Sequence, residues 1–253
     1  MKTNKPMRIC ECHSGLSAIL VEKSDYDGMW VSSLTHSTIH GLPDNELVPL
    51  KERVELVEEV KKLTTKPIIV DVDTLGPIEH TPFYARWFKE AGAWAIVIED
   101  KKYPKENSLL DDGSYPLEDV DKFCKKISVA KEHSGDMKII ARLESLIAKH
   151  SMEEALLRAE AYDKAGADMI LIHSKQKIEA AEVMEFAERF GKISSKPLVA
   201  IPTTYILPEE HPFVITINAN HMLRASFKAM ENYVNGKNPE LSTVNEIFDL
   251  VGH

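Results

Sequence analysis

A short apolar run in the middle of the chain ends in charged residues. Residues 95–98 are apolar, as in a strand buried in a parallel sheet, and two carboxylates and a lysine follow directly from Glu99 onward. A polar loop beyond them carries Lys105 and Asn107 behind a proline. Carboxylates at the end of a strand suit a divalent cation. A loop with a lysine and an asparagine suits a phosphoryl or carboxylate group that is delivered to that cation.

Two more carboxylates stand at an earlier strand end. Asp71 and Asp73 are two residues apart, so that alternation along a strand points both side chains the same way. With Glu99 on the neighbouring strand they form an oxygen-rich cluster. Three close carboxylates repel one another without a cation, and hard oxygen ligands suit Mg²⁺. An Asp-x-Asp pair alone is often only a helix cap, but together with Glu99 it predicts a magnesium site.

Three further side chains at strand ends each admit two interpretations. Arg142 could be a structural ion-pair partner of Glu144, but at an acid-lined mouth we expect its guanidinium to fork onto phosphate or carboxylate oxygens. His173 could be a hydrogen-bonded core histidine, but a serine and a lysine follow it, which favours a functional role. Trp30 is interpreted as part of the wall of the site rather than as a reacting group.

The apolar segments that must position these residues alternate with amphipathic segments of helical length. We expect strands at residues 8–11, 28–32, 68–71, 95–98, 138–142, 169–172, 198–201 and 213–217. We expect helices at residues 14–22, 47–63, 81–91, 117–132, 151–166, 177–190, 221–234 and 242–250, with a long polar loop after the second strand.

This alternation predicts an α/β fold with a parallel sheet and right-handed crossovers. At 253 residues a closed TIM-type (β/α)₈ barrel with C-terminal helices is favoured over an open doubly wound sheet. The weakest part of this prediction is the segment 202–212, which is too short for a full helix. Without a repeat or a linker, residues 1–253 are expected to form one domain.

In such a barrel the carboxyl ends of the strands form the active face. Polar groups stand at seven of these ends, which favours one shared site over scattered surface residues: residues 30–32, 71–73, 99–101, 142–144, 173–175, 203–204 and 218–221. No glycine-rich nucleotide-binding loop follows any strand, which excludes the usual nucleotide sites.

The composition limits the kinds of molecule that the protein can bind and the compartment in which it occurs. The net charge of −9 argues against nucleic acid, and it means that an anionic substrate must be held by a local cluster of cations. No apolar run approaches the roughly 20 residues needed to span a bilayer, and the first six residues are not a signal peptide. The three cysteines are expected to be buried free thiols, which indicates the cytoplasm.

At this point the sequence resembles the phosphoenolpyruvate mutase family of the isocitrate lyase superfamily. The most specific likeness is the segment 99–108, Glu-Asp-Lys-Lys-Tyr-Pro-Lys-Glu-Asn-Ser. Further similar segments cover nearly the whole chain, at residues 11–18, 30–35, 41–44, 67–74, 141–147, 172–175 and 219–226.

The resemblance implies an isomerase that interconverts phosphoenolpyruvate and phosphonopyruvate, the step that makes the C–P bond of phosphonates. It implies Mg²⁺ at Asp71, with Asp73 and Glu99 acting directly or through water. It also implies homodimers or tetramers that exchange the last barrel helix, at residues 221–234. Because the equilibrium should favour phosphoenolpyruvate, a phosphonate pathway would need a next enzyme that consumes phosphonopyruvate.

The same resemblance implies roles for the other residues of the site. The substrate carboxylate would be cradled by Ser32, Ser33 and Leu34, with Trp30 beside them. The phosphoryl group would be held by Asn107, Arg142 and His173, with Ser108 at the end of the same signature. Lys105 and Asn107 would belong to a gating loop, and Asp44 matches a family residue near the reacting centre.

Three alternatives stay open. Carbon–carbon lyases of the superfamily carry a catalytic cysteine in this loop, and residues 104–108 contain none. Phosphonopyruvate hydrolases usually have threonine at the position of Asn107, so that this residue favours the mutase. A non-enzymatic binding protein would be expected to have lost the acid cluster or the loop, and both are intact.

The chain also departs from the family pattern. Residues 75–80 replace a glycine-rich turn, Val72 stands where a small residue is frequent, and His36 stands where related mutases often have an acid. The segment after the seventh expected strand is short. These departures bear on the substrate or the rate rather than on the metal-dependent chemistry of phosphonates or 2-oxoacids.

Overall fold

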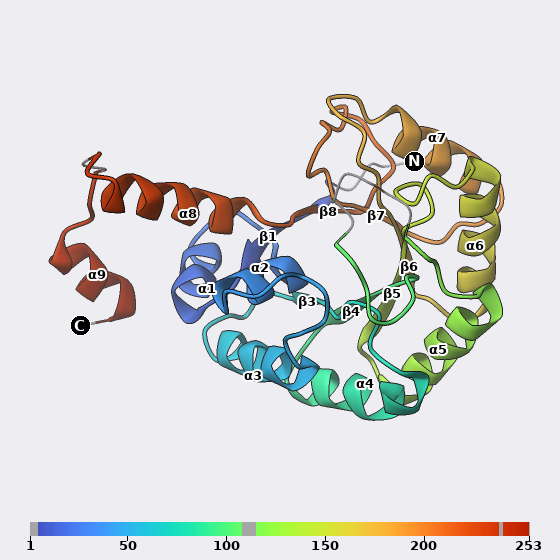
Figure 1. The fold of residues 1–253 in the computed structure, drawn as a ribbon, viewed down its shortest axis with the longest axis horizontal. Helices are drawn as coiled ribbons and strands as arrows, with labels where there is room; N and C mark the ends of the chain where they lie inside the picture. Colours follow the sequence, from blue (N-terminus) through green and yellow to red (C-terminus); the bar gives the residue numbers. More distant parts are fainter. Residues whose placement is uncertain (1–4, 108–114, 238–239, 253) are drawn as a thin grey trace.

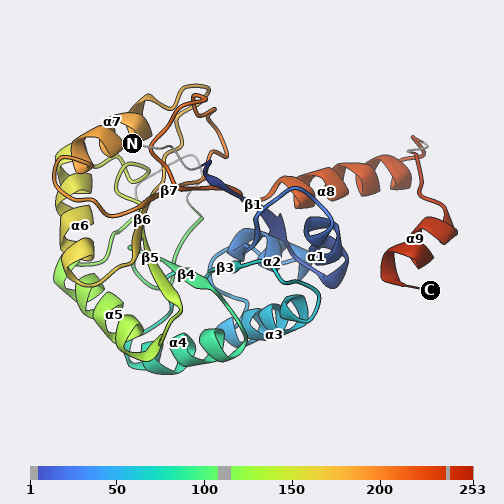
Figure 2. The ribbon, with the colours of Figure 1, turned by 180° about the vertical axis from the view of Figure 1, so that it is seen from behind.

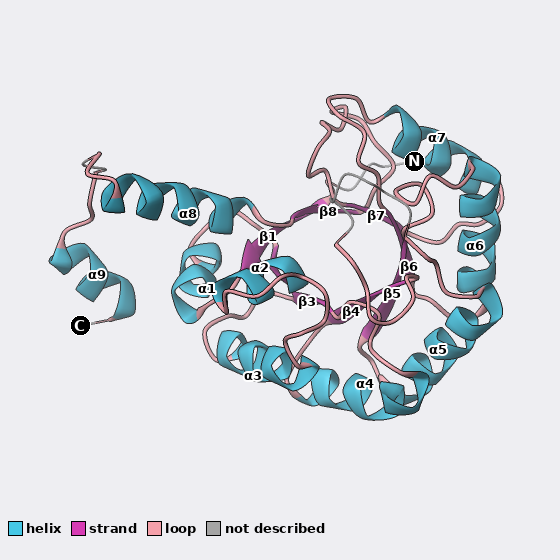
Figure 3. Cartoon of the chain, in the orientation of Figure 1, coloured by secondary structure: helices cyan, strands magenta, loops and turns pink. Residues whose placement is uncertain are grey.

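The strands form the ring that carries the site. The computed structural model describes residues 5–107, 115–237 and 240–252, and over them eight parallel strands close into a barrel (Figure 1, Figure 3). The strands follow one another in chain order, and β8 closes the ring by pairing with β1. Their bounds are β1 Met7–Cys12, β2 Gly28–Val31, β3 Ile68–Asp71, β4 Ala95–Glu99, β5 Lys138–Leu143, β6 Met169–Ile172, β7 Leu198–Ala200 and β8 Ile215–Asn218. The predicted TIM-type barrel is confirmed.

Helices surround the barrel on the outside (Figure 1). Their bounds are α1 Gly15–Glu22, α2 Ser33–Ile39, α3 Leu50–Lys61, the 3₁₀ helix η1 Ile78–His80, α4 Thr81–Glu90, α5 Val120–His133, α6 Met152–Lys164, α7 Ala181–Phe190, α8 His221–Val234 and α9 Val244–Val251. The prediction of a loop after the second strand missed α2. Ser32 caps that helix, and the buried face of α2 is made of serine, threonine and histidine, which leaves no apolar period to detect.

The core has two layers because side chains of a strand alternate between two faces. In β4, Ala95 and Val97 pack inside the barrel, whereas Ile96 and Ile98 pack against the helices. All three cysteines are free thiols; Cys10 and Cys12 are buried as expected, but Cys124 is only half-buried. Within the described ranges, none of the helices combines the length and the apolar character needed to cross a bilayer.

The ring of helices is incomplete between α7 and α1. The connection from β7 to β8 contains no helix, as the shortness of residues 202–212 predicted. Helix α8 then runs away from the barrel instead of packing on it, and α9 turns back beside it (Figure 1, Figure 2). No residue of α8 or α9 is buried.

Asp100 belongs to the packing between strand and helix rather than to the acid cluster. Strand alternation points it outward, where its Oδ2 accepts hydrogen bonds from Tyr162 at 2.8 Å and from Arg158 at 3.3 Å. Its Oδ1 accepts the backbone N–H of Glu144 at 2.8 Å. Because that residue follows β5, Asp100 fixes the strand end that carries Arg142.

We therefore expect Tyr162→Phe to lower the free energy of unfolding by about 1–3 kcal/mol, because it removes a hydrogen-bond donor from a buried carboxylate. Urea unfolding monitored by circular dichroism measures the change. Tyr205→Phe is the matched control, because the hydroxyl of Tyr205 is buried without a hydrogen-bond partner among the described residues. An equal loss of stability in both variants would contradict the role given to Asp100.

Candidate active site

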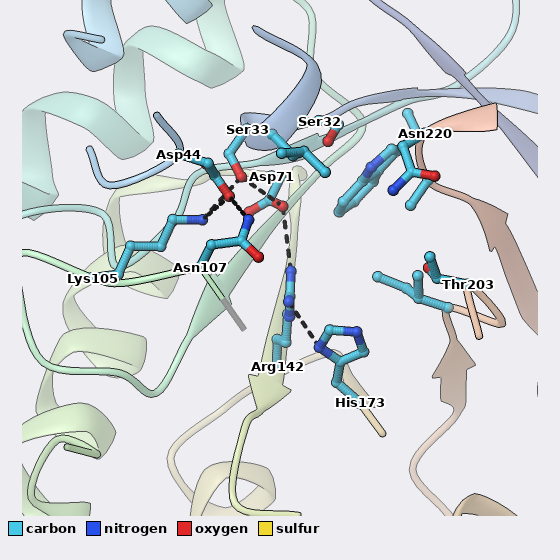
Figure 4. A pocket seen from close by; sticks show the side chains of 14 residues that line it. Ser32, Ser33, Asp44, Asp71, Lys105, Asn107, Arg142, His173, Thr203 and Asn220 are labelled. Atoms are coloured by element: carbon cyan, nitrogen blue, oxygen red, sulfur yellow. Dashed lines mark hydrogen bonds and ion pairs between the residues drawn. The ribbon is translucent and has the colours of Figure 1, made fainter. Parts of the chain in front are cut away.

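A cavity lies at the carboxyl ends of the strands (Figure 4). Side chains two residues apart on a strand point the same way, and this alternation brings residues of the strand ends to the cavity. Ile140 points into the barrel, and Arg142, two residues on, reaches the cavity. The same step leads from Leu171 to His173. The cavity is lined by Trp30, Ser32, Ser33, Leu34, Asp44, Asp71, Lys105, Asn107, Arg142, His173, Ile201, Thr203, Ala219 and Asn220.

The ammonium group of Lys105 lies among the acids. Its Nζ is 2.7 Å from Oδ1 of Asp73, 3.0 Å from Oδ2 of Asp44 and 3.9 Å from Oε1 of Glu99. It also lies 3.2 Å from Oγ of Ser33, to which it donates a hydrogen bond. Burial would lower the pKa of Lys105, but the surrounding carboxylates outweigh it and raise the pKa well above its usual value. Lys105 is therefore charged and neutralises the acids around it.

Asp73 is held by two cations. Arg53, buried on α3, donates from Nη1 to Oδ2 of Asp73 at 2.8 Å and to the carbonyl of Asp71 at 2.8 Å. Burial would raise the pKa of Asp73, but Arg53 and Lys105 outweigh it, so that the pKa lies below its usual range. Asp73 is thus an anion.

Asp71, the last residue of β3, faces the cavity. Its Oδ2 accepts from the hydroxyl of Ser33 at 3.2 Å and from Nη1 of Arg142 at 3.3 Å. Burial raises the pKa of Asp71, and the charge of Arg142 opposes that rise. Asp71 therefore connects the serine side of the cavity to the arginine side (Figure 4).

Glu99 is the acid of the cluster with the fewest hydrogen bonds among the described residues. It stands opposite Arg142 in the register between β4 and β5, and the nearest guanidinium nitrogen is 3.7 Å from its Oε2. Neither carboxylate oxygen has a hydrogen-bond partner among the described residues, although the side chain is buried. Burial raises the pKa of Glu99 to about 7, with Lys101 and Lys105 acting against it.

Arg142 and His173 form one unit with Glu144. Nε of Arg142 donates to Oε1 of Glu144 at 2.5 Å, and Nη2 lies 2.8 Å from Nδ1 of His173. That Nδ1 also lies 2.9 Å from Oε1 of Glu144. Burial and the charge of Arg142 lower the pKa of His173, which favours the neutral ring. With Nδ1 turned toward this unit, Nε2 is the ring nitrogen left to bind a substrate.

Asp44 and Asn107 line the side of the cavity opposite Arg142 and His173. Nδ2 of Asn107 donates to Oδ2 of Asp44 at 2.6 Å, the same oxygen that Lys105 approaches (Figure 4). The other oxygen of Asp44 is buried without a hydrogen-bond partner among the described residues. Trp30 lines the wall of the cavity, as expected. Its buried Nε1 likewise has no hydrogen-bond partner in the described part of the chain.

The structure brings together almost all the residues that the sequence placed in the site. Ten of them line the cavity, and Asp73 and Glu99 lie beneath it around Lys105. Ser108 lies outside the described residues. Sequence reasoning missed Arg53, although a signal was present: this charged residue shares the apolar face of α3 with Val57 and Val60.

The donor set fits Mg²⁺ in its chemistry. Asp71, Asp73 and Glu99 supply hard carboxylate oxygens, and both oxygens of Glu99 are buried without hydrogen bonds. In their present positions, however, the described residues contain no group of three acid, histidine or cysteine side chains placed to hold a metal ion. In this arrangement Lys105 and Arg53 contact the oxygens of Asp73. The magnesium site stays a prediction.

Known proteins resemble the whole chain. The family model described as phosphoenolpyruvate phosphomutase matches residues 1–236. Phosphoenolpyruvate phosphomutase of Tetrahymena pyriformis is 36% identical over 96% of this chain and 86% of that protein. The crystal structure of phosphoenolpyruvate phosphomutase from Streptomyces platensis subsp. rosaceus has a TM-score of 0.90 at 32% identity, covering 99% of this chain and 92% of that one. Phosphonopyruvate hydrolase in complex with oxalate and Mg²⁺ has a TM-score of 0.84 at 29% identity, covering 98% and 90%.

The buried carboxyl group of Glu99 accepts no hydrogen bond from the described residues, and its raised pKa predicts a pH dependence of stability. The folded protein keeps the proton of Glu99 up to about pH 7, whereas an exposed glutamate loses it near 4.5. Between these values the folded state binds more protons than the unfolded state, so this residue makes stability fall as pH rises. We expect Glu99→Gln to remove that fall and to gain roughly 2–3 kcal/mol relative to wild type between pH 4.5 and pH 8.

Urea unfolding of both proteins in EDTA, at several pH values, measures this difference. Glu55→Gln, an exposed change on α3, is the control and should run parallel to wild type. A constant difference between Glu99→Gln and wild type at every pH would show that the carboxyl group does not titrate as described.

Proposed function

The chain is an enzyme that belongs to the phosphoenolpyruvate phosphomutase family, whose name-giving members are isomerases, and from its site we propose that it interconverts phosphoenolpyruvate and phosphonopyruvate with Mg²⁺. The observation that supports this best is the placement of Arg142 and Asn107 at one cavity with the acid cluster. Donors for a phosphoryl group and oxygens for a cation thus meet at one cavity.

The proposed reaction moves a phosphoryl group within one molecule. The P–O bond to the enol oxygen breaks and a P–C bond to the methylene carbon forms, so that no water is consumed. Such a transfer passes through a loose transition state and depends on positioning and charge neutralisation. Arg142, Asn107 and the free nitrogen of His173 would bind the phosphoryl oxygens as they move. Ser32, Ser33 and the backbone at Leu34 would bind the carboxylate.

Asp71, Asp73 and Glu99 are the residues that would hold Mg²⁺. The bound ion would neutralise the negative charge that the substrate adds to a cavity already rich in carboxylates. Lys105 performs part of that neutralisation itself, because its ammonium group contacts Asp73 and Asp44. Support for Mg²⁺ comes also from the similar hydrolase, whose structure contains oxalate and Mg²⁺.

Hydrolysis is the second candidate reaction, because a phosphonopyruvate hydrolase is among the similar structures. It would send the phosphoryl group to water instead of oxygen or carbon of the substrate. Asn107 favours the mutase, since the hydrolases usually have threonine at that position. Carbon–carbon cleavage is disfavoured because none of the described residues lining the cavity is a cysteine.

³¹P NMR of the purified protein with Mg²⁺ and phosphonopyruvate tests the proposal. We expect an enol-phosphate resonance to grow in wild type, to disappear with EDTA and to grow at least tenfold more slowly in Asn107→Ala. Asn107 is the cleaner site for substitution than Arg142, whose removal would leave several buried acids unpaired. Inorganic phosphate alone would identify a hydrolase, and an unchanged spectrum would contradict any phosphoryl transfer.

We also propose that subunits pair by exchanging α8. The helix carries a stripe formed by Phe227, Met230 and Tyr233, each about 60% exposed. The barrel has no helix of its own between α7 and α1, and α1 leaves Leu16 and Leu20 exposed. A second copy of this chain would cover both surfaces with its own α8, giving a dimer that could pair further into a tetramer.

Light scattering coupled to gel filtration tests the exchange. Wild type is expected at the mass of a dimer or tetramer, and Phe227→Ser combined with Met230→Ser is expected to lower that mass. Lys228→Gln, a polar change on the same helix, should leave the mass as in wild type. A monomeric wild-type protein would refute the exchange.

The proposed reaction has a preferred direction and a cellular compartment. Formation of phosphonopyruvate is uphill on general C–P energetics, so we propose that a further enzyme consumes it where phosphonates are made. We place the reaction in the cytoplasm, in keeping with the free thiols.

A further inference from the structure

Glu46 joins three segments that carry the site. It lies in the connection between α2 and α3, two residues after Asp44. Its Oε1 accepts the backbone N–H of Thr74 at 3.1 Å and the hydroxyl of Thr74 at 2.6 Å. Its Oε2 accepts the backbone N–H of Lys105 at 2.8 Å. One carboxylate thus binds the turn after β3 with one oxygen and the Lys105 segment with the other.

The Thr74 side of this bridge is rigid. Lys126, buried on α5, donates from Nζ to the carbonyls of Thr74 and Gly76, both at 2.7 Å. The turn needs such support because Asp73 and Leu75 have positive φ angles of 54° and 60°, which side chains other than glycine rarely adopt. Glu46 is therefore anchored on a turn that already fixes Asp73.

The Lys105 side of the bridge positions a charge. The backbone N–H that Glu46 accepts belongs to the residue whose ammonium group lies 2.7 Å from Asp73. The side chain of Lys105 is long and flexible, so that fixing its backbone restricts the positions that its ammonium group can take. Glu46 itself has a φ of 63°, a left-handed conformation that residues other than glycine rarely adopt.

We propose that Glu46 is a positioning residue: it holds the backbone of Lys105 against the turn of Asp73 and so keeps the ammonium group of Lys105 in the acid cluster. The catalytic consequence rests on the proposed function, since Lys105 neutralises charge at the cavity in which the phosphoryl group would move. The positioning itself does not depend on which reaction the site performs.

Glu46→Gln tests the proposal with little change of shape. The amide has one oxygen and one NH₂ group, so it can accept from Thr74 or from Lys105 but not from both. Because Thr74 offers two donors, we expect the oxygen to stay there and the NH₂ group to face the N–H of Lys105. The amide hydrogen of Lys105 should then exchange with solvent roughly tenfold faster in the ligand-free protein, as NMR would measure.

Two comparisons separate positioning from a general loss of stability. The amide of Ile139 in β5 should exchange as in wild type, because it donates to Asp168, whereas the hydrogen bonds of Glu46 go to Thr74 and Lys105. Glu55→Gln makes the same chemical change on the exposed surface of α3 and should alter neither amide. Unchanged exchange at Lys105 in Glu46→Gln, or equal acceleration at Lys105 and Ile139, would overturn the proposal.

Turnover provides the second measurement. We expect kcat for the phosphoryl transfer to fall at least fivefold in Glu46→Gln with a smaller change in KM, because Lys105 is displaced while the groups that bind the substrate stay. Wild-type kcat together with faster exchange would refute the catalytic consequence. If wild type itself transfers no phosphoryl group, the proposed function fails, and the exchange at Lys105 still decides the role of Glu46.

Discussion

The burial of charge at the mouth of the barrel is the constraint on which the rest of the site depends. Four carboxylates, those of Asp44, Asp71, Asp73 and Glu99, each lie within 3.9 Å of a nitrogen of Lys105 or Arg142. Such a cluster is stable only when cations balance it, since buried like charges repel strongly. Lys105 supplies one cation from a loop, and the guanidinium groups from α3 and β5 supply two more. When an anion or a metal ion binds at such a site, the contacts between these carboxylates and cations must change.

The barrel makes the balance possible because it brings distant segments to one rim. The acids come from β3, β4 and the connection after α2, whereas the cations come from β5, α3 and the loop after β4. No local segment could hold them alone. The hydrogen bonds of Glu46 and Lys126 to backbone groups then fix the loops on which the charges sit, so that the geometry does not depend on ion pairs alone.

Much of this could be predicted from the sequence, and the failures have physical reasons. The strands were visible as short apolar runs, and strand ends with polar residues located Asp71, Arg142 and His173. Helix α2 was missed because its buried face is polar. The place of Lys105 among the acids could not be predicted, because it depends on how a loop folds over the barrel. Arg53 was missed although it shares the buried face of α3 with Val57 and Val60, because a charged residue on an apolar face gives no direct indication of its partner.

The alternation of side chains along β4 also gives two neighbouring acids different surroundings, so that substitutions at them should have different effects. Glu99 lies beside Lys105 beneath the cavity, and Asp100, the next residue, faces Tyr162 and the helices. Substitutions at these adjacent codons should therefore separate in a mutational scan. Changes at Asp100 would appear chiefly as a lower amount of protein in the cell, and changes at Glu99 as normal amounts of an impaired protein. On the proposed function, these adjacent acids would meet separate requirements, one set by folding and the other by chemistry.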